Sequence, residues 1–190
     1  KQHEIVAEYN TVKNRIALNN QLIQKLEETA QTIYKQWFVD FEFPDENGKP
    51  YKSSGGKMFW DEELEREIPE GWSLGKMEDI VSIEMGQSPK GKFVNTFEGI
   101  EFHQGKIQFT EKYLAPSENK TTVPNKIAEP NDVLLCVRAP VGIANITERQ
   151  ISIGRGLCAI RQFSNIKSDF LFYFLESFRT EFIKKATGTT

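Results

Sequence analysis

The chain has 190 residues and a net charge of −3, with 38% hydrophobic and 27% charged residues. This composition can bury a core and so excludes a wholly disordered chain, and the length fits one globular domain with an extension. No apolar run approaches the roughly 20 residues that a membrane helix requires, and the start has no signal-peptide pattern, so we expect no membrane partner.

Cysteine and histidine are scarce. Cys136 and Cys158 each lie in a strand-like apolar run, which predicts two reduced thiols in the core. His3 and His103 are isolated in the sequence and form no ligand cluster, so we expect no metal site. These features are typical of a cytoplasmic protein.

Charge is unevenly distributed along the chain. Residues 1–68 carry 9 Lys and Arg against 13 Asp and Glu, whereas residues 69–190 carry 15 against 14. The second part is nearly neutral, so any affinity for nucleic acid must come from a local patch. Residues 151–167 include Arg155, Arg161 and Lys167 and no acid, although so short a basic run is also typical of a solvated face.

The first predicted element is a long helix from His3 to Phe38, a stretch with neither proline nor glycine. Its apolar residues recur at alternating spacings of four and three, which is the pattern of a coiled-coil seam. The seam has two rows: Ile5, Val12, Asn19, Leu26 and Ile33 in one, and Tyr9, Ile16, Ile23, Ala30 and Trp37 in the other.

A stripe this regular, on a helix roughly 50 Å long, cannot bury itself. We therefore expect a partner helix from the same protein, from a second copy of this chain as a homodimer, or from another protein. Asn19 is the polar exception, and such a residue fixes register and partner choice at a cost in stability. The alternative is a helix packed on its own domain.

The helix is predicted to stop at Pro44. Residues 45–57 are rich in turn formers and predict a loop, residues 58–66 predict a short turn of helix, and Ile68 begins a new unit. The expected domains are a coiled-coil arm at 1–43, a linker at 44–67 and a second domain at 68–190.

Short runs rich in Val, Ile, Leu and Phe follow, separated by Gly, Pro and Asn, and they predict strands. These runs are residues 72–76, 80–85, 107–109, 133–137, 141–146 and 157–161. A helix is predicted from Phe170 to Lys185, capped by Ser168 or Asp169 and ended by Gly188. The expected fold class is α+β, with a long N-terminal helix followed by a mixed-sheet domain that a C-terminal helix closes.

Signatures of catalysis are missing from the sequence. It has neither the Asn/Asp-Pro-Pro-aromatic loop of a methyltransferase nor a Walker loop, and Gly154-Arg155-Gly156 lacks the third glycine of a dinucleotide fingerprint. Glu118-Asn119-Lys120 matches part of a nuclease motif but has no paired Asp on a strand. We therefore expect no enzymatic activity, with a nuclease using Glu118 and Lys120 as an alternative.

Several segments, occurring in a fixed order, carry a family resemblance. They are residues 19–28, 37–41, 44–58 and 68–72, the Gly86-Gln87-Ser88-Pro89 turn, and residues 132–142 and 153–161. Together they resemble the conserved helical region, the connecting segment and the target recognition domain of type I restriction-modification specificity (S) subunits. One arm and one recognition domain suggest either part of a longer S subunit or a half-length S protein that pairs with itself. The end of the chain favours the first, because the family's second conserved region would begin just beyond it.

The resemblance implies a non-catalytic role. An S subunit reads a bipartite double-stranded DNA target with two recognition domains, and its helices separate these domains and dock the methyltransferase (M) subunits; the restriction (R) subunits join that assembly. S-adenosylmethionine, ATP and Mg²⁺ would belong to those partner subunits, and this chain would hold no cofactor.

Base reading needs hydrogen-bonding side chains in the major groove, while phosphate contacts set the register. The loops between strands predict these DNA contacts: Gln87, Ser88, Lys90, Lys92, His103, Gln104, Lys106, Arg138 and Arg155. Gln87 and Gln104 suit adenine, whereas Arg138 and Arg155, in family-like strands, suit backbone phosphates. The main alternative is a coiled-coil adaptor whose globular head binds protein.

Overall fold

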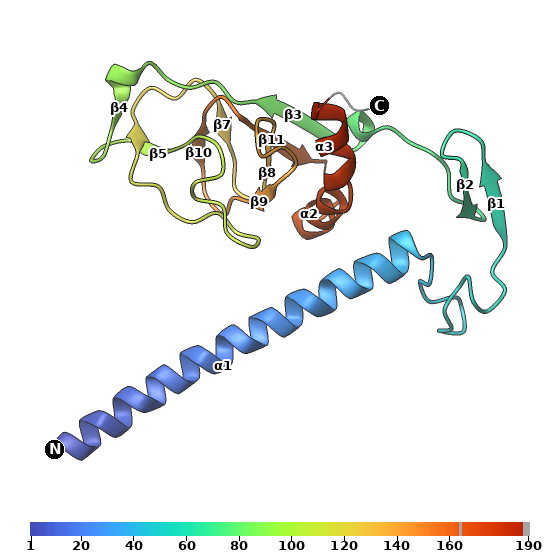
Figure 1. The fold of residues 1–190 in the computed structure, drawn as a ribbon, viewed down its shortest axis with the longest axis horizontal. Helices are drawn as coiled ribbons and strands as arrows, with labels where there is room; N and C mark the ends of the chain where they lie inside the picture. The colour runs from blue at the N-terminus through green and yellow to red at the C-terminus, as the bar shows by residue number, and fades with distance from the viewer. Residues whose placement is uncertain (164, 188–190) are drawn as a thin grey trace. The chain divides into compact units, whose positions relative to one another are not determined.

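The computed structural model describes residues 1–163 and 165–187. The chain divides into two compact units, Lys1–Leu74 and Gly75–Thr190. The first unit holds the long helix and a β-hairpin, and the second holds two sheets and the C-terminal helices (Figure 1). The α+β fold class is therefore confirmed.

The predicted arm is confirmed as a helix. α1 spans Gln2–Tyr34 and continues as a π-helical turn, η1, over Lys35–Val39. The predicted stop at Pro44 is wrong, because the helix already ends at Asp40. Phe41 has a φ of 60°, in the left-handed region where a right-handed helix cannot continue.

Aromatic side chains pack at the end of the arm. Phe41 is buried and meets Trp72 edge-on, with 5.5 Å between ring centroids, and the Arg66 guanidinium lies 4.8 Å from the Phe41 centroid. Phe43 stacks on Tyr51 at 4.7 Å and on Trp72 at 5.5 Å. Trp72 is thereby held in the first unit, and residues 72–76 do not form the predicted strand.

A β-hairpin replaces the turn of helix that was predicted over residues 58–66. β1 (Met58–Asp61) pairs antiparallel with β2 (Arg66–Pro69). The Asp61 carboxylate accepts hydrogen bonds from the backbone N–H groups of Glu63 and Leu64, at 3.1 and 2.8 Å. This Asx turn reverses the chain, so the acidic residues that suggested a helix are the loop of a hairpin.

The second unit has two sheets. One, in the order β4-β6-β5-β10-β7, comprises Val94–Asn95, Lys120–Thr121, Ile100–His103, Ile151–Ile153 and Ile127–Ala128. The other, in the order β3-β11-β8-β9, comprises Val81–Met85, Leu157–Gln162, Val133–Cys136 and Ala144–Ile146. The first sheet is mixed, because β10 runs parallel to β5 and antiparallel to β7.

The strands predicted at 80–85, 133–137 and 157–161 are confirmed, and that at 141–146 is confirmed for its last three residues. The strand predicted at 107–109 is wrong: this apolar triplet lies in a turn closed by a hydrogen bond from the Phe109 N–H to the Lys106 carbonyl. Strands β4 to β7 and β10 were not predicted, because two to four residues carry too little periodicity.

The core lies where β8, β10 and β11 meet. Leu134, Cys136, Ile151, Leu157 and other apolar side chains form one buried cluster there. Both cysteines are buried and free, as predicted, and burial raises the pKa of each thiol to about 11. They are therefore protonated and unreactive at neutral pH.

The C-terminal helix is divided in two. α2 (Ser168–Ser177) buries Leu171 and Leu175 and packs on β8 and β9, and α3 (Arg179–Thr187) follows after a break at Phe178. Neither predicted cap is used, since the N-cap is Lys167 and Asp169 instead forms an ion pair with Lys112 at 2.8 Å. The predicted end at Gly188 lies outside the described residues.

Within the described residues, no helix has the length and apolar character needed to cross a bilayer.

A network of charged and polar side chains links β5 to the segments that precede β6 and β10. Glu101 accepts two hydrogen bonds from the Arg149 guanidinium at 2.8 Å, one from the Ser117 N–H at 2.9 Å, and contacts His103 Nε2 at 2.9 Å. Burial raises the pKa of Glu101, but the hydrogen bonds from Arg149, Ser117 and His103 outweigh this and hold the pKa at about 2. Burial also lowers the pKa of His103, although Glu101 opposes that shift.

This network predicts acid sensitivity. Glu101 and His103 both bind protons more weakly when folded, so stability should begin to fall below the unfolded His pKa, near 6.5, and fall further from about pH 4.5 towards pH 2. The Glu101→Gln substitution should cost about 2–3 kcal/mol at neutral pH, because it leaves Arg149 without its ion pair. It should also flatten the decline below pH 4.5. Urea unfolding between pH 2 and 8 measures both effects.

Glu98 provides the matched control, because its side chain is exposed. Glu98→Gln should reproduce the wild-type stability and pH profile. Equal profiles for wild type and Glu101→Gln below pH 4.5 would contradict the role assigned to Glu101.

Candidate nucleic-acid interface

Five loop segments of the second unit converge at the ends of the central strands. We call them the loop cluster: residues 86–92, 103–108, 122–127, 137–142 and 153–157. Backbone hydrogen bonds connect them, from Gln87 N–H to the Ile153 carbonyl (3.0 Å), Gly154 N–H to the His103 carbonyl (2.8 Å), Ile153 N–H to the Lys126 carbonyl (3.0 Å) and Val137 N–H to the Gly156 carbonyl (2.9 Å). Segments far apart in the sequence therefore form one surface.

Two glycines allow this close approach. A methyl group on Gly86 would overlap the carbonyl oxygens of Gly154 and Leu157, and one on Gly154 would lie 2.8 Å from the Phe102 ring. Gly86 also donates its backbone N–H to the Leu157 carbonyl at 2.9 Å. Packing therefore requires a glycine at both positions: Gly86 lies against backbone oxygens, and Gly154 lies against the Phe102 ring and Ser88 Oγ.

Ser88 lies at the centre of the loop cluster. Its Oγ accepts a hydrogen bond from the Arg155 N–H at 3.0 Å and donates one to Gln104 Oε1 at 3.3 Å. Its carbonyl accepts a hydrogen bond from Asn125 Nδ2 at 2.9 Å. One residue thus connects three other segments.

The loop cluster is rich in available positive charge. Its five segments contain no Asp or Glu. Within the part of the chain that the structure describes, no ion pair is found for Lys90, Lys92, Lys106, Arg138 and Arg155, all of which are exposed, whereas the sixth lysine or arginine of the loop cluster, Lys126, pairs with Glu84 of β3. The Arg138 side chain lies beside Gly156, the residue that follows Arg155 in the chain. Such unpaired cations suit phosphate groups.

Eight of the nine predicted contacts belong to this surface: Gln87, Ser88, Lys90, Lys92, Gln104, Lys106, Arg138 and Arg155. His103 also lies in the loop cluster, but its side chain does not reach the surface, so this prediction requires correction. Its side chain is 0% exposed and is bonded to Glu101, so it supports the fold from below the surface. Asn125 was missed, because only the folded chain brings it to Ser88, 37 residues away in sequence.

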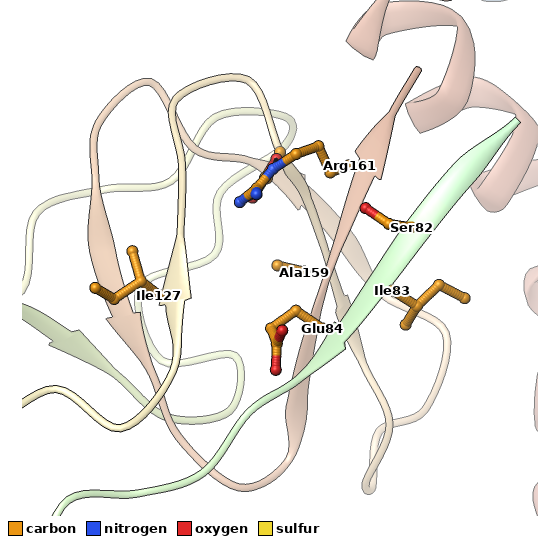
Figure 2. A pocket seen from close by; sticks show the side chains of 7 residues that line it. Ser82, Ile83, Glu84, Ile127, Ala159 and Arg161 are labelled. Atoms are coloured by element: carbon orange, nitrogen blue, oxygen red, sulfur yellow. Dashed lines mark hydrogen bonds and ion pairs between the residues drawn. The ribbon is translucent and has the colours of Figure 1, made fainter.

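A separate polar pocket of about 80 Å³ lies between β3, β7 and β11. Arg161 and Glu84 point into it from β11 and β3 (Figure 2). Arg161 donates two hydrogen bonds to Asp132, at 2.9 and 2.7 Å, and Glu84 pairs with Lys126. The charges here are mutually satisfied, so of the basic residues in segment 151–167, Arg155 is the one that joins the loop cluster.

No metal centre is apparent in residues 1–163 and 165–187, where no three His, Cys, Asp or Glu side chains lie together as ligands. Lys120 belongs to β6 of the mixed sheet, and Glu118 is exposed in the segment just before that strand, so neither belongs to the loop cluster.

The arm presents a second surface. Its seam side chains are uncovered within the first unit: Ile5, Tyr9, Val12, Ile16, Asn19, Ile23, Leu26, Ile33 and Trp37 are exposed, and Ala30 is half-buried. Val6, Leu18 and Leu22 are also exposed apolar residues of the arm, but they lie outside the two seam rows. The coiled-coil pairing of these residues stays a prediction.

The sequence matches the family of the type I restriction modification DNA specificity domain over residues 69–190. It is 33% identical over 179 residues to the putative type I restriction enzyme MjaX specificity subunit of Methanocaldococcus jannaschii, covering 92% of this chain and 39% of that protein. It is 32% identical over 84 residues to the MjaIX specificity subunit of the same organism, covering 44% of this chain and 16% of that protein. The chain thus spans about two fifths or less of the length of these relatives.

Solved structures give the same result. The HsdS subunit from Thermoanaerobacter tengcongensis superposes with a TM-score of 0.61 at 28% identity, over 97% of this chain and 42% of that one. A structure described as addressing complex assembly and conformational transition of the type I R-M system has a TM-score of 0.61 at 27% identity, over 95% of this chain and 42% of that one.

Within the loop cluster, an alanine substitution should lower stability at Gly86 but not at Gly91. Gly86→Ala should destabilise the protein by about 1–3 kcal/mol, because the backbone oxygens that meet the new methyl group cannot move aside independently. Gly91→Ala is the control, since a methyl group there meets no atom within 4 Å. Urea unfolding measures both, and equal stabilities would rule out the proposed backbone constraint.

Proposed function

Because the chain belongs to the family of type I restriction-modification specificity subunits, we propose that its second unit reads one half of a bipartite double-stranded DNA target. The observation that supports this best is the loop cluster, where exposed cations lack ion pairs and no acid intervenes. Lys90, Lys92 and Lys106 would contact phosphates from two of its loops, and Arg138 and Arg155 would do so from two others.

The arm would connect this reader to the rest of the complex. Its exposed seam supports pairing with a second helix, from the same protein or from another copy, and docking of the methyltransferase subunit. The restriction subunit would join that assembly. S-adenosylmethionine, ATP and Mg²⁺ would be bound by these partners in the cytoplasm. This chain would determine which DNA sequence is bound and would not itself catalyse a reaction.

An adaptor that binds protein through its head would also use an exposed arm. The acid-free loop cluster favours DNA, because a polyanion is the ligand for which unpaired cations give the greatest advantage. Measuring the binding of random and target DNA duplexes in the presence of the methyltransferase subunit distinguishes the two functions. If neither kind of duplex binds, the result favours the adaptor.

Arg138→Ala and Arg155→Ala should each weaken binding to all DNA sequences and lower the slope of log K against log salt by about 0.9. The reason is that each arginine would release one condensed counterion. Fluorescence anisotropy across a salt series measures the slope. Lys76→Ala is the control, because Lys76 already pairs with Glu78 outside the loop cluster. Unchanged slopes in both arginine variants would reject their phosphate contacts.

A charge placed in the seam should disrupt assembly. Ile23→Asp should weaken association with the methyltransferase subunit on the order of 10–100-fold, because an apolar contact is replaced by a buried charge. Leu18→Asp is a matched control: Leu18 is 64% exposed and Ile23 58%, but Leu18 lies outside the two seam rows. Titration of the complete specificity subunit with the methyltransferase subunit measures the affinities. Equal losses would argue against the seam as the interface.

A further inference from the structure

The hydrogen bonds around Ser88 determine which way two exposed amide side chains face. We infer that Asn125 and Gln104 are the side chains that read bases, and that Ser88 is the positioning residue that orients both. This inference rests on the proposed function and assigns a specific role within it, including to Asn125, which the sequence did not single out.

The orientation of Asn125 follows from the chemistry of its partner. The Ser88 carbonyl can only accept a hydrogen bond, so the amide nitrogen of Asn125 must face it, at 2.9 Å. Asn125 Oδ1 and the second N–H then face away. Asn125 is exposed, and no other hydrogen bond to its side chain is found among the described residues.

The remaining donor and acceptor of Asn125 suit a particular base. A carbonyl oxygen next to an N–H is the pair that forms the bidentate contact with adenine, accepting from N6 and donating to N7. The bond to Ser88 occupies one of the two N–H groups of the amide, and Oδ1 and the other N–H remain for a base. We therefore assign adenine to Asn125.

Gln104 is oriented by the same residue but offers different groups. The Ser88 hydroxyl donates its single proton to Gln104 Oε1 at 3.3 Å, and the same oxygen accepts a hydrogen bond from the Arg155 N–H at 3.0 Å. With Oε1 engaged, the amide nitrogen of Gln104 presents two donors. Guanine offers two acceptors, N7 and O6, on its major-groove edge, so guanine is the base that fits Gln104.

The surrounding charges support a reading position for both amides. Arg155 donates its own backbone N–H to Ser88 Oγ, Lys90 lies two residues beyond Ser88, and Lys106 lies two residues beyond Gln104. Phosphate contacts by these cations would fix the register of the duplex and bring the amides to the base edges between the phosphates.

Selection from a library of randomised duplexes tests the assignment, using the complete specificity subunit that contains this chain together with its methyltransferase subunit. Asn125→Ala should lower the preference for adenine at one position of the selected half-site by about ten- to a hundredfold, and Gln104→Ala should do the same for guanine at another position. The remaining positions should be retained in both variants.

Ser88→Ala distinguishes positioning from a general structural role. It removes the hydroxyl that orients Gln104 but keeps the backbone carbonyl that holds Asn125. The guanine preference should therefore relax while the adenine preference persists. Loss of both preferences, or of neither, would overturn the role of Ser88.

Two controls separate the possible failures. Asn119→Ala changes an exposed asparagine outside the loop cluster and should leave the selected sequence unchanged. If the wild-type complex selects no sequence, the proposed DNA-reading function itself fails. If it selects one and neither Asn125→Ala nor Gln104→Ala alters it, the function stands and the assignment of these two residues is wrong.

Discussion

Gly86 and Gly154 bring two backbone segments closer together than any side chain would allow. This contact joins the end of β3 to the turn between β10 and β11. A hydrogen bond from the Gly154 N–H to the His103 carbonyl also connects that turn to β5. Ser88 follows two residues after Gly86, so its position depends on the same contact. The surface loops are therefore held by backbone geometry, which leaves their side chains available for other interactions.

The distribution of acids explains how a nearly neutral unit can present a positive surface. Glu101 and Asp132 are engaged by Arg149 and Arg161 within the sheets, and Glu84 by Lys126. Each pair leaves its arginine or lysine unavailable to phosphate, and it neutralises a carboxylate that belongs to no segment of the loop cluster. The cations that are not paired are then gathered in loops without acids, and this separation matters more for a polyanionic ligand than the total charge does.

The sequence allowed those parts of the fold to be predicted that depend on long or strongly apolar patterns. The arm followed from its heptads, and β8 and β11 followed from continuous runs of buried residues. Short strands such as β6 and the hairpin at Met58–Pro69 were missed, because their pairing depends on contacts between distant residues rather than on local periodicity. The same reason applies to the candidate site: the loops rich in Gln and Lys were visible, but neither the burial of His103 nor the approach of Asn125 to Ser88 has a local signal.

The uncovered stripe on α1 also has a consequence for the amount of this protein in a cell. Most helical stability in proteins comes from the packing of an apolar face, so an arm without its partner opens more often than one in a complex. Proteases cleave transiently opened segments in proportion to the population of the open form. If the arm pairs as proposed, chains without a partner helix would therefore be degraded faster than paired ones.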